Sequence, residues 1–187
     1  MEARADVPST GRALLATAVV GGAIAAVVLG GYAIGGALMG AAGPPIDVAG
    51  VVRVQPLSGW ELAARFAEPP RARLTRGSGN LDVVAVPFAG PAAELARQYV
   101  RAVLEPEARQ LSVSREVERV TLESGLPGVR IAYVGLFGKA QAPIEGEVTA
   151  FVSPSGVGAV FDAWGPEGVL RYVLDDVRTM IERAVIG

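Results

Sequence analysis

The feature that most constrains this chain is a long stretch without an ionisable side chain. No Asp, Glu, Lys or Arg occurs between Arg12 and Asp47, and small or aliphatic residues fill most of the gap. Its most apolar part, 13–34, exceeds the roughly 20 residues that a helix needs to cross a bilayer. We therefore predict a transmembrane helix over 13–40.

A cleaved signal peptide is the competing interpretation. Its apolar region usually spans only about 7–15 residues, which is shorter than the stretch found here. Arg4 and Arg12 precede the stretch, whereas only Arg53 follows it closely, and basic residues are preferentially retained on the cytoplasmic side. The sequence thus predicts a cytoplasmic tail over 1–12, a single-pass anchor in the cytoplasmic membrane, a linker over 41–50 and an extracytoplasmic domain over 51–187.

Small residues recur at intervals of four along the predicted span. They form one stripe with Gly22, Ala26 and Gly30, and a second stripe with Gly31 and Gly35. Such stripes let two helices approach closely in a membrane, which would suit a structural subunit of a membrane complex. The alternative is a GC-rich genome, such as an actinobacterial one, that fills the span with Ala and Gly codons.

The composition excludes several classes of function. The chain has no cysteine and no histidine, so disulfides, thiolate sites, a lipidated cysteine and the commonest metal ligand are all ruled out. Its formal net charge of −2 and pI near 5.3 provide no basic surface for nucleic acid. We expect no nucleic-acid partner, no cofactor, no metal site and no catalytic residue.

Beyond the linker, apolar and β-branched runs bounded by turn residues predict strands. The expected strands are Val51–Val54, Trp60–Phe66, Ala72–Arg76, Leu81–Pro87, Leu111–Val113, Val117–Leu122, Gly128–Leu136, Ile144–Val152 and Val157–Trp164. Gly90-Pro91 opens a helical pattern, and Gly165-Pro166-Glu167 opens a second one. The apolar faces of these helices would carry Ala92, Leu95, Ala96, Tyr99 and Val103, and Val169, Val173, Val177, Met180, Ile181 and Ala184.

This order of elements predicts an α+β domain. An antiparallel sheet covered by the two helices, as in an α/β/α sandwich, would bury both apolar helix faces. The order, together with the closing run Val160–Gly168, resembles the fold of PsbP-type extrinsic proteins, a eukaryotic Ran-binding nucleotide-release factor and certain actinobacterial envelope lipoproteins. The resemblance implies a binding or accessory module and carries over no site residue. This chain lacks the lipidated cysteine of those lipoproteins, so the span would supply the anchor.

Two acidic residues lie two apart on a predicted strand. Glu145 and Glu147 would point to one face, and Asp162 on the next strand would join them in an acid/base pair or a hard-cation site. The alternative is a polar face paired with arginines such as Arg130. We favour this alternative, which leaves a carboxylate-based enzyme as the least supported function.

Two further patterns are only faint signals of catalysis. The run Gly135–Ala140 resembles a phosphate loop, but its glycines are too close and no Ser or Thr follows Lys139. A serine nucleophile such as Ser155 has no histidine, and Lys139 is the only alternative base. We do not assign a site to either pattern.

Basic and aromatic residues are better candidates for binding. Arg71, Arg73 and Arg76 could meet an acidic partner or lipid headgroups, or could simply protect a sheet edge. The large aromatic residues that could line a pocket are Trp60, Tyr99, Phe137, Phe161 and Trp164. We select Trp164, with its neighbours Asp162 and Phe161, as the predicted ligand-binding residues of a non-enzymatic module that binds a protein partner or an envelope molecule.

Overall fold

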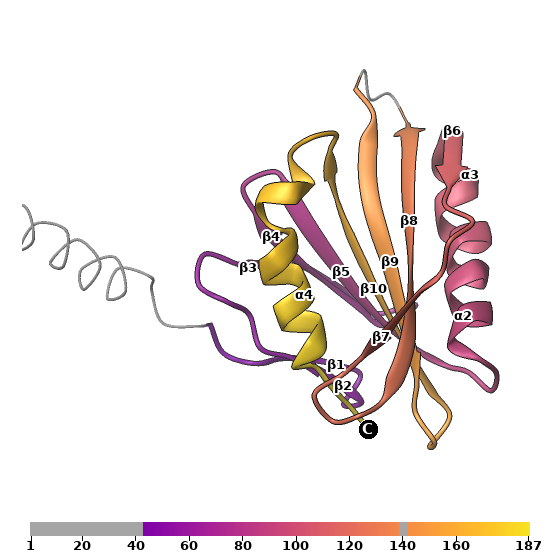
Figure 1. Ribbon diagram of the computed structural model, residues 1–187. Coiled ribbons are helices and arrows are strands. Elements are labelled where there is room, and N and C mark those ends of the chain that lie inside the picture. Colours follow the sequence, from indigo (N-terminus) through magenta and orange to yellow (C-terminus); the bar gives the residue numbers. More distant parts are fainter. Residues whose placement is uncertain (1–42, 139–141) are drawn as a thin grey trace, which may run out of the picture. The chain divides into compact units, whose positions relative to one another are not determined.

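The computed structural model describes residues 43–138 and 142–187 (Figure 1). Within these ranges no helix is long and apolar enough to cross a bilayer. The predicted span over 13–40, with its glycine stripes, lies outside the described residues, as do the tail over 1–12 and Lys139.

A large antiparallel sheet dominates the described part of the chain. Its eight strands run in the order β3-β4-β5-β10-β9-β8-β6, and β7 also pairs with β8. The bounds are β3 (Glu61–Phe66), β4 (Arg71–Arg76), β5 (Gly79–Pro87), β6 (Ala108–Val113), β7 (Glu118–Thr121), β8 (Pro127–Phe137), β9 (Ile144–Val152) and β10 (Val157–Pro166). The strands expected from the sequence are all present, with ends displaced by at most three residues.

Tight turns fix the register of the two central hairpins. β4 and β5 are joined at Gly77, which has a positive φ of 59°, and β9 and β10 are joined through Gly156 with a φ of 83°. Glycine adopts this backbone region without the steric penalty that other residues meet. The registers place Arg73 opposite Asp82 in the first hairpin and Asp162 opposite Val148 in the second.

One face of the sheet is covered by a continuous helical segment. It consists of α2 (Ala92–Tyr99), the π-helical stretch η1 (Val100–Leu104) and α3 (Glu105–Glu107). Its apolar side packs on inward-facing strand residues to form the α2-side core, which includes Leu95, Val148 and Val160. The first expected helix is therefore confirmed.

The opposite face is covered by α4 (Leu174–Glu182), preceded by the 3-10 turn η2 (Leu170–Tyr172). Val177 and Met180 pack there with Phe151 and Phe161 in the α4-side core. The helix begins later than the sequence pattern predicted, because Gly165 and Pro166 still pair with β9 and extend β10. Figure 1 shows α2 and α4 flanking the sheet.

A small second sheet closes one side of the α4-side core. Its order is β1 (Ile46–Val48), β2 (Val52–Val54) and β11 (Val185–Ile186). The sequence did not predict β1 or β11, and β1 falls in the segment 41–50 that was expected to be a linker. Ile46 and Val48 are buried, so the folded domain begins before residue 51.

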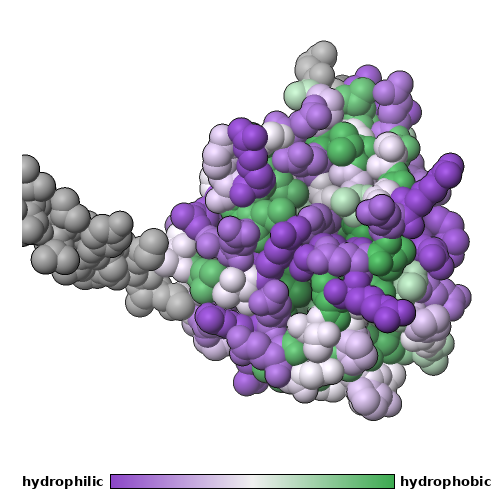
Figure 2. All heavy atoms as spheres, in the orientation of Figure 1, coloured by the Kyte–Doolittle hydropathy of each residue, from purple (hydrophilic) through white to green (hydrophobic). Residues whose placement is uncertain are grey.

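The described residues thus form an α+β domain with an antiparallel sheet between helices. On the face shown in Figure 2, hydrophobic side chains form small areas separated by polar ones. The large hydrophobic residues exposed in residues 43–138 and 142–187 are Leu62, Phe66, Val134, Tyr172 and Val185. They are too scattered along the elements to form one broad apolar face.

Candidate ligand-binding site

Alternation along three strands, β4, β5 and β10, gathers charged and aromatic side chains on the α2 side of the sheet. Side chains two apart on a strand share a face. Val160 belongs to the α2-side core, so Asp162 and Trp164 face the same way. Arg71 and Arg73 on β4 join them, as does Asp82 on β5.

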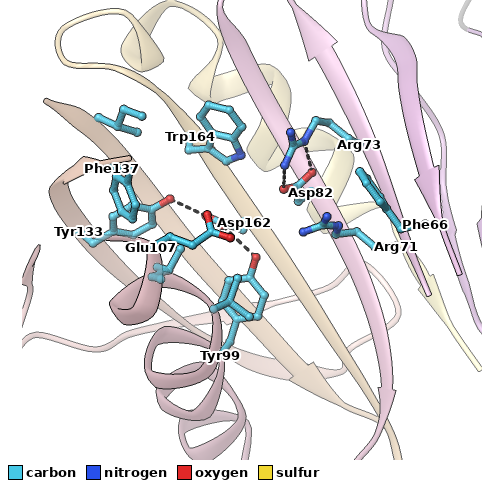
Figure 3. A pocket seen from close by; sticks show the side chains of 13 residues that line it. Phe66, Arg71, Arg73, Asp82, Tyr99, Glu107, Tyr133, Phe137, Asp162 and Trp164 are labelled. Carbon is cyan, nitrogen blue, oxygen red and sulfur yellow. Dashed lines mark hydrogen bonds and ion pairs between the residues drawn. The ribbon is translucent and has the colours of Figure 1, made fainter. Parts of the chain in front are cut away.

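A cavity of about 350 Å³ opens between this sheet face and the segment α2–η1–α3 (Figure 3). We call it the main cavity. Its charged and aromatic lining residues are Phe66, Arg71, Arg73, Asp82, Tyr99, Glu107, Tyr133, Phe137, Asp162 and Trp164. The helical segment contributes Tyr99, Val103, Leu104 and Glu107 around its π-helical turn, and such turns frequently occur at functional sites.

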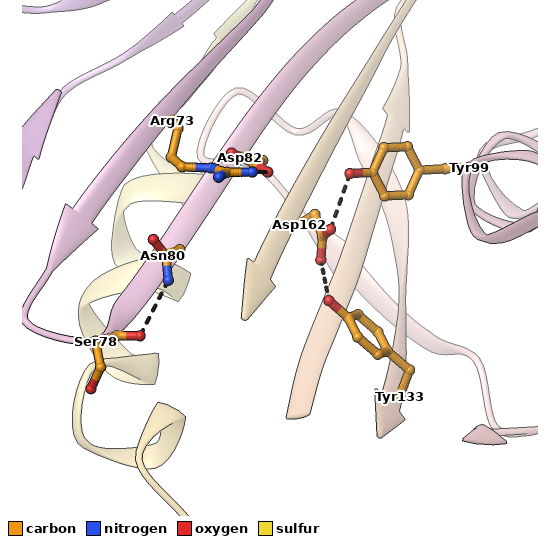
Figure 4. A network of polar contacts seen from close by, with 7 residues as sticks. All are labelled: Arg73, Ser78, Asn80, Asp82, Tyr99, Tyr133 and Asp162. Carbon is orange, nitrogen blue, oxygen red and sulfur yellow. Dashed lines mark hydrogen bonds and ion pairs between the residues drawn. The ribbon is translucent and has the colours of Figure 1, made fainter. Parts of the chain in front are cut away.

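Asp162 is one of the two buried acids of the main cavity, with Asp82. The Tyr133 hydroxyl donates a hydrogen bond of 2.8 Å to Oδ1, and the Tyr99 hydroxyl donates one of 3.0 Å to Oδ2 (Figure 4). Burial raises the pKa of Asp162 to about 7, while both hydroxyls act to lower it. Both carboxylate oxygens are therefore already held by protein donors.

The two tyrosines remain protonated in this arrangement. Desolvation by burial, followed by the charge of Asp162, raises the pKa of Tyr99 and of Tyr133 far above the ordinary range. Gly146 makes the arrangement possible, because a Cβ at that position would collide with the Tyr133 ring. The phenol can therefore lie over β9 and reach Asp162.

Asp82 has a different partner. The Arg73 guanidinium donates from Nε to Oδ1 and from Nη2 to Oδ2, both at 2.7 Å. This two-point geometry is the strong form of an Arg–carboxylate pair, and the hydrogen bond to Asp82 raises the pKa of Arg73. Arg73 also lies over the Trp164 ring, at 5.1 Å from the centroid. The charge of Asp82 is thereby neutralised within the protein.

Arg71 lacks such a carboxylate partner. Its guanidinium lies 4.0 Å from the centroid of the Phe66 ring, and its Nε is buried without a hydrogen-bond partner among the described residues. In Figure 3 the guanidinium points inward, toward Asp82 and Tyr99. A buried donor without a partner is costly, and the guanidinium that carries it can donate hydrogen bonds to an oxygen of a bound ligand.

The three predicted ligand-binding residues are only partly brought together. Trp164 and Asp162 line the main cavity, whereas Phe161 points to the opposite face. The Phe161 ring is fully buried and packs edge-to-face on Phe151 at 6.0 Å. The reason is strand alternation, which turns neighbouring residues to opposite faces.

The acidic pair on β9 is committed to structural contacts on the α4 side. Glu145 accepts a hydrogen bond of 2.9 Å from the Gly168 N–H. Glu147 pairs with Arg178 at 2.7 Å and with Arg130 at 3.4 Å. Asp162 faces the other way, so the proposed three-carboxylate site does not exist. No group of three or more potential metal ligands occurs within the described ranges.

The other residues singled out in the sequence, Arg76, Trp60 and Ser155, lie outside the main cavity. Arg76 forms an ion pair with Asp176, which also accepts a hydrogen bond from the Trp60 indole at 3.3 Å. The predicted basic stretch is therefore divided between two environments. The Ser155 hydroxyl contacts Ser153 and the Gly187 carbonyl.

The faint phosphate loop is mostly strand. Gly135 and Phe137 belong to β8, and the Phe137 ring lines the main cavity. A strand does not present the row of backbone N–H groups that cradles a phosphate. The part of the run from Lys139 lies outside the described residues.

Sequence analysis missed Asp82, Tyr133 and Phe66. A signal for Asp82 was present, because a lone acid interrupts the apolar run Leu81–Val86. In the structure, the register of β4 and β5 places Arg73 opposite this acid. Tyr133 and Phe66 carried no comparable signal, since aromatic residues in strands are usually core residues.

The chain matches no protein-family model and no curated protein sequence. Several solved structures are similar to it, two of which are described here. Cyanobacterial PsbP (CyanoP) from Synechocystis sp. PCC 6803 has a TM-score of 0.55 at 16% identity, covering 75% of this chain and 89% of that one. The Ran-binding protein Mog1p of Saccharomyces cerevisiae has a TM-score of 0.55 at 9% identity, covering 76% and 94%.

At such low identities the two structures establish the fold and nothing about the ligand. The expected fold is confirmed in its main features, an antiparallel sheet with two helices. The described domain therefore has a PsbP-like α+β fold.

Proposed function

We propose that this chain is a membrane-anchored, extracytoplasmic binding module that holds a small anionic ligand in the main cavity. The observation that carries the proposal is the unpartnered, buried Nε of Arg71. Arginine presents a planar fork of donors that suits carboxylate and phosphate groups. A ligand oxygen in the cavity could pair with the Arg71 guanidinium, which lines the cavity and forms no ion pair within the described residues.

The charges around the cavity favour an anion over a cation. Asp82 is neutralised by Arg73, and Asp162 receives two tyrosine hydroxyl donors. Glu107 is exposed, so solvent screens its charge. Arg71 is therefore the charged side chain of the cavity that still has a hydrogen-bond donor available for a ligand.

The same contacts support binding rather than catalysis. A general base must present an oxygen to the substrate at hydrogen-bond distance, which is hindered when protein donors already hold that oxygen. The oxygens of Asp162 and Asp82 are both held in two-point contacts, and Glu147 is paired with two arginines. We therefore propose a non-enzymatic role, in which recognition depends on Arg71, the aromatic lining and the rigid sheet.

Ligand binding can be tested with the full chain in lipid nanodiscs. Thermal unfolding would be followed with a panel of short carboxylates and inorganic phosphate. A ligand that binds only the folded state raises Tm, by an amount that grows with the logarithm of its concentration above Kd, so at least one anion should raise Tm in the wild type and not in Arg71→Gln. Arg119→Gln is the matched control, because Arg119 is exposed on β7. An equal response in Arg71→Gln and wild type would exclude Arg71 as the anion site.

The anchor and its orientation need a separate experiment. The support is the uncharged stretch over 13–40, preceded by Arg4 and Arg12. Single cysteines can be introduced at exposed Ser114 or Arg119, since the chain has no cysteine of its own. On intact cells a membrane-impermeant maleimide should label both positions. Labelling only after lysis would place the domain in the cytoplasm and refute the proposed orientation.

A further inference from the structure

A second, apolar cavity lies beside the main cavity. This side cavity has a volume of about 290 Å³ and shares Phe66, Arg71, Tyr99 and Val103 with the main cavity. Beyond these shared residues it is lined chiefly by aliphatic side chains. They include Val84, Val86, Leu95, Ala102 and Val160. Arg71 therefore lies where a polar cavity meets an apolar one.

The two cavities differ in the chemistry that they offer to a ligand. The main cavity contains the buried donor of Arg71, the Tyr99 and Tyr133 phenols and the indole of Trp164. The side cavity offers mainly aliphatic surface, with Glu68 and Gln98 exposed at its mouth. Apolar surface removed from water contributes favourably to binding. A single ligand that extends past Arg71 from one cavity into the other would meet a cation at one end and aliphatic side chains at the other.

We infer that the site takes a single-chain amphipathic carboxylate, with the carboxylate on Arg71 and the aliphatic chain in the side cavity. The inference rests on the proposed function, because it assigns the chemical class of the anion. The shared position of Arg71 carries it, and the fork geometry of a guanidinium matches a carboxylate. Each methylene that becomes fully buried should strengthen binding about fourfold.

The fold explains why this cavity exists. β4 and the helical segment both border it, and the Phe66 ring from β3 covers the Arg71 guanidinium. Phe66 is 39% exposed, so its ring is available to cover a bound chain near Arg71. Aromatic side chains combine large contact area with few rotatable bonds, which favours such a role.

The test uses the full chain in lipid nanodiscs with a decanoate analogue that carries a photoreactive diazirine on its chain. Labelled peptides are mapped by mass spectrometry, and unlabelled decanoate, butyrate and decanol are added as competitors. We expect labelling on the segment around Leu95 and Ala102. Decanoate should compete at least tenfold better than butyrate, and decanol should compete at least tenfold worse than decanoate.

Variants separate the contribution of the ligand's carboxylate from that of its aliphatic chain. Arg71→Gln should reduce labelling at least tenfold, and the control Arg119→Gln should not. Ala102→Leu fills part of the side cavity and should weaken competition by decanoate but not by butyrate. Ala63→Leu places the same substitution at an exposed position of β3 outside both cavities, and should change neither.

The outcomes distinguish this inference from the proposed function. Equal competition by butyrate and decanoate, with Arg71 still required, would overturn the amphipathic ligand and leave an anion site. Labelling that persists in Arg71→Gln, or equal competition by decanol, would overturn the inference and also remove the support for an anion at Arg71. Absence of any labelling within the domain overturns the inference, and the Tm response to short anions then decides the proposed function separately.

Discussion

Asp162 and Asp82 lie directly opposite each other on the neighbouring strands β10 and β5, yet different partners stabilise their carboxylates. Asp82 is held by the Arg73 guanidinium, and Asp162 is held by two neutral tyrosine hydroxyls. Asp82 also contributes to the raised pKa of Asp162. One carboxylate is therefore paired with a cation, while the pKa of the other, Asp162, is raised to about 7.

The first prediction concerns stability as a function of pH. The pKa of Asp162 is about 7 in the folded domain and 3.8 ordinarily, so the folded state holds this proton more tightly than the unfolded chain. The contribution is fully present below about pH 4 and is lost as the pH rises through about 7. The pKa difference corresponds to a loss on the order of 4 kcal/mol over this window. Asp162→Asn should lack this component of the pH dependence.

Urea unfolding of the full chain at pH 5 and pH 8 measures the effect. Asp175→Asn is the matched control, because Asp175 is exposed at the start of α4 and its variant should follow the wild-type pH dependence. If the free energy of unfolding of Asp162→Asn changes with pH as much as that of wild type, Asp162 does not titrate in this window.

The second prediction concerns the tyrosine donors. The hydroxyl of Tyr133 lowers the pKa of Asp162 through its hydrogen bond, so Tyr133→Phe should move the titration midpoint of Asp162 upward from about 7. Carbon-13 NMR of the labelled carboxyl groups follows the midpoint. Tyr172→Phe serves as the control, since Tyr172 is 72% exposed. An unchanged or lower midpoint in Tyr133→Phe would show that the phenol does not donate to the ionised carboxylate.

The third prediction concerns the buried ion pair. Arg73→Met leaves the Asp82 carboxylate buried without its cation and should reduce the free energy of unfolding by roughly 3 kcal/mol. Adding Asp82→Leu removes the stranded charge and should restore most of the loss. The control is Arg53→Met, which removes an exposed pair with Asp47 at 3.8 Å and should change stability by less than about 1 kcal/mol. Denaturant unfolding that shows equal losses for Arg73→Met and Arg53→Met would contradict the assigned burial of Asp82.

The fourth prediction concerns the space that Gly146 leaves for Tyr133. A methyl group at this position would collide with the Tyr133 ring, so Gly146→Ala should destabilise the domain by about 1–3 kcal/mol. The displaced phenol should also lose its hydrogen bond to Asp162, which would raise the pKa of that acid. Gly43→Ala is the control, because the nearest atoms lie 3.9 Å from its added Cβ. Wild-type stability with an unchanged Asp162 midpoint would show that the ring does not need this space.

The sequence by itself determined the type of most elements, because each leaves a local pattern. Alternation along β9 and β10 and the helical spacing of Leu95 and Tyr99 follow from the backbone periodicities. The same patterns predicted an antiparallel sheet between helices. The patterns did not fix where each element ends. The strand expected to end at Trp164 extends through Gly165-Pro166, because β9 still offers a partner there.

Only the tertiary structure decided which side chains meet. Asp82 and Asp162 are 80 positions apart in the sequence, and they meet because β5 and β10 pair at one particular register. Strand alternation then separates Phe161 from Asp162 and Trp164, whose adjacency in the sequence suggested one site. The partner of a buried charge and the face of a sheet depend on long-range register, which local propensity does not encode. The lone acids inside the apolar runs of β5 and β10 were the local traces of the polar network on the α2 side of the sheet.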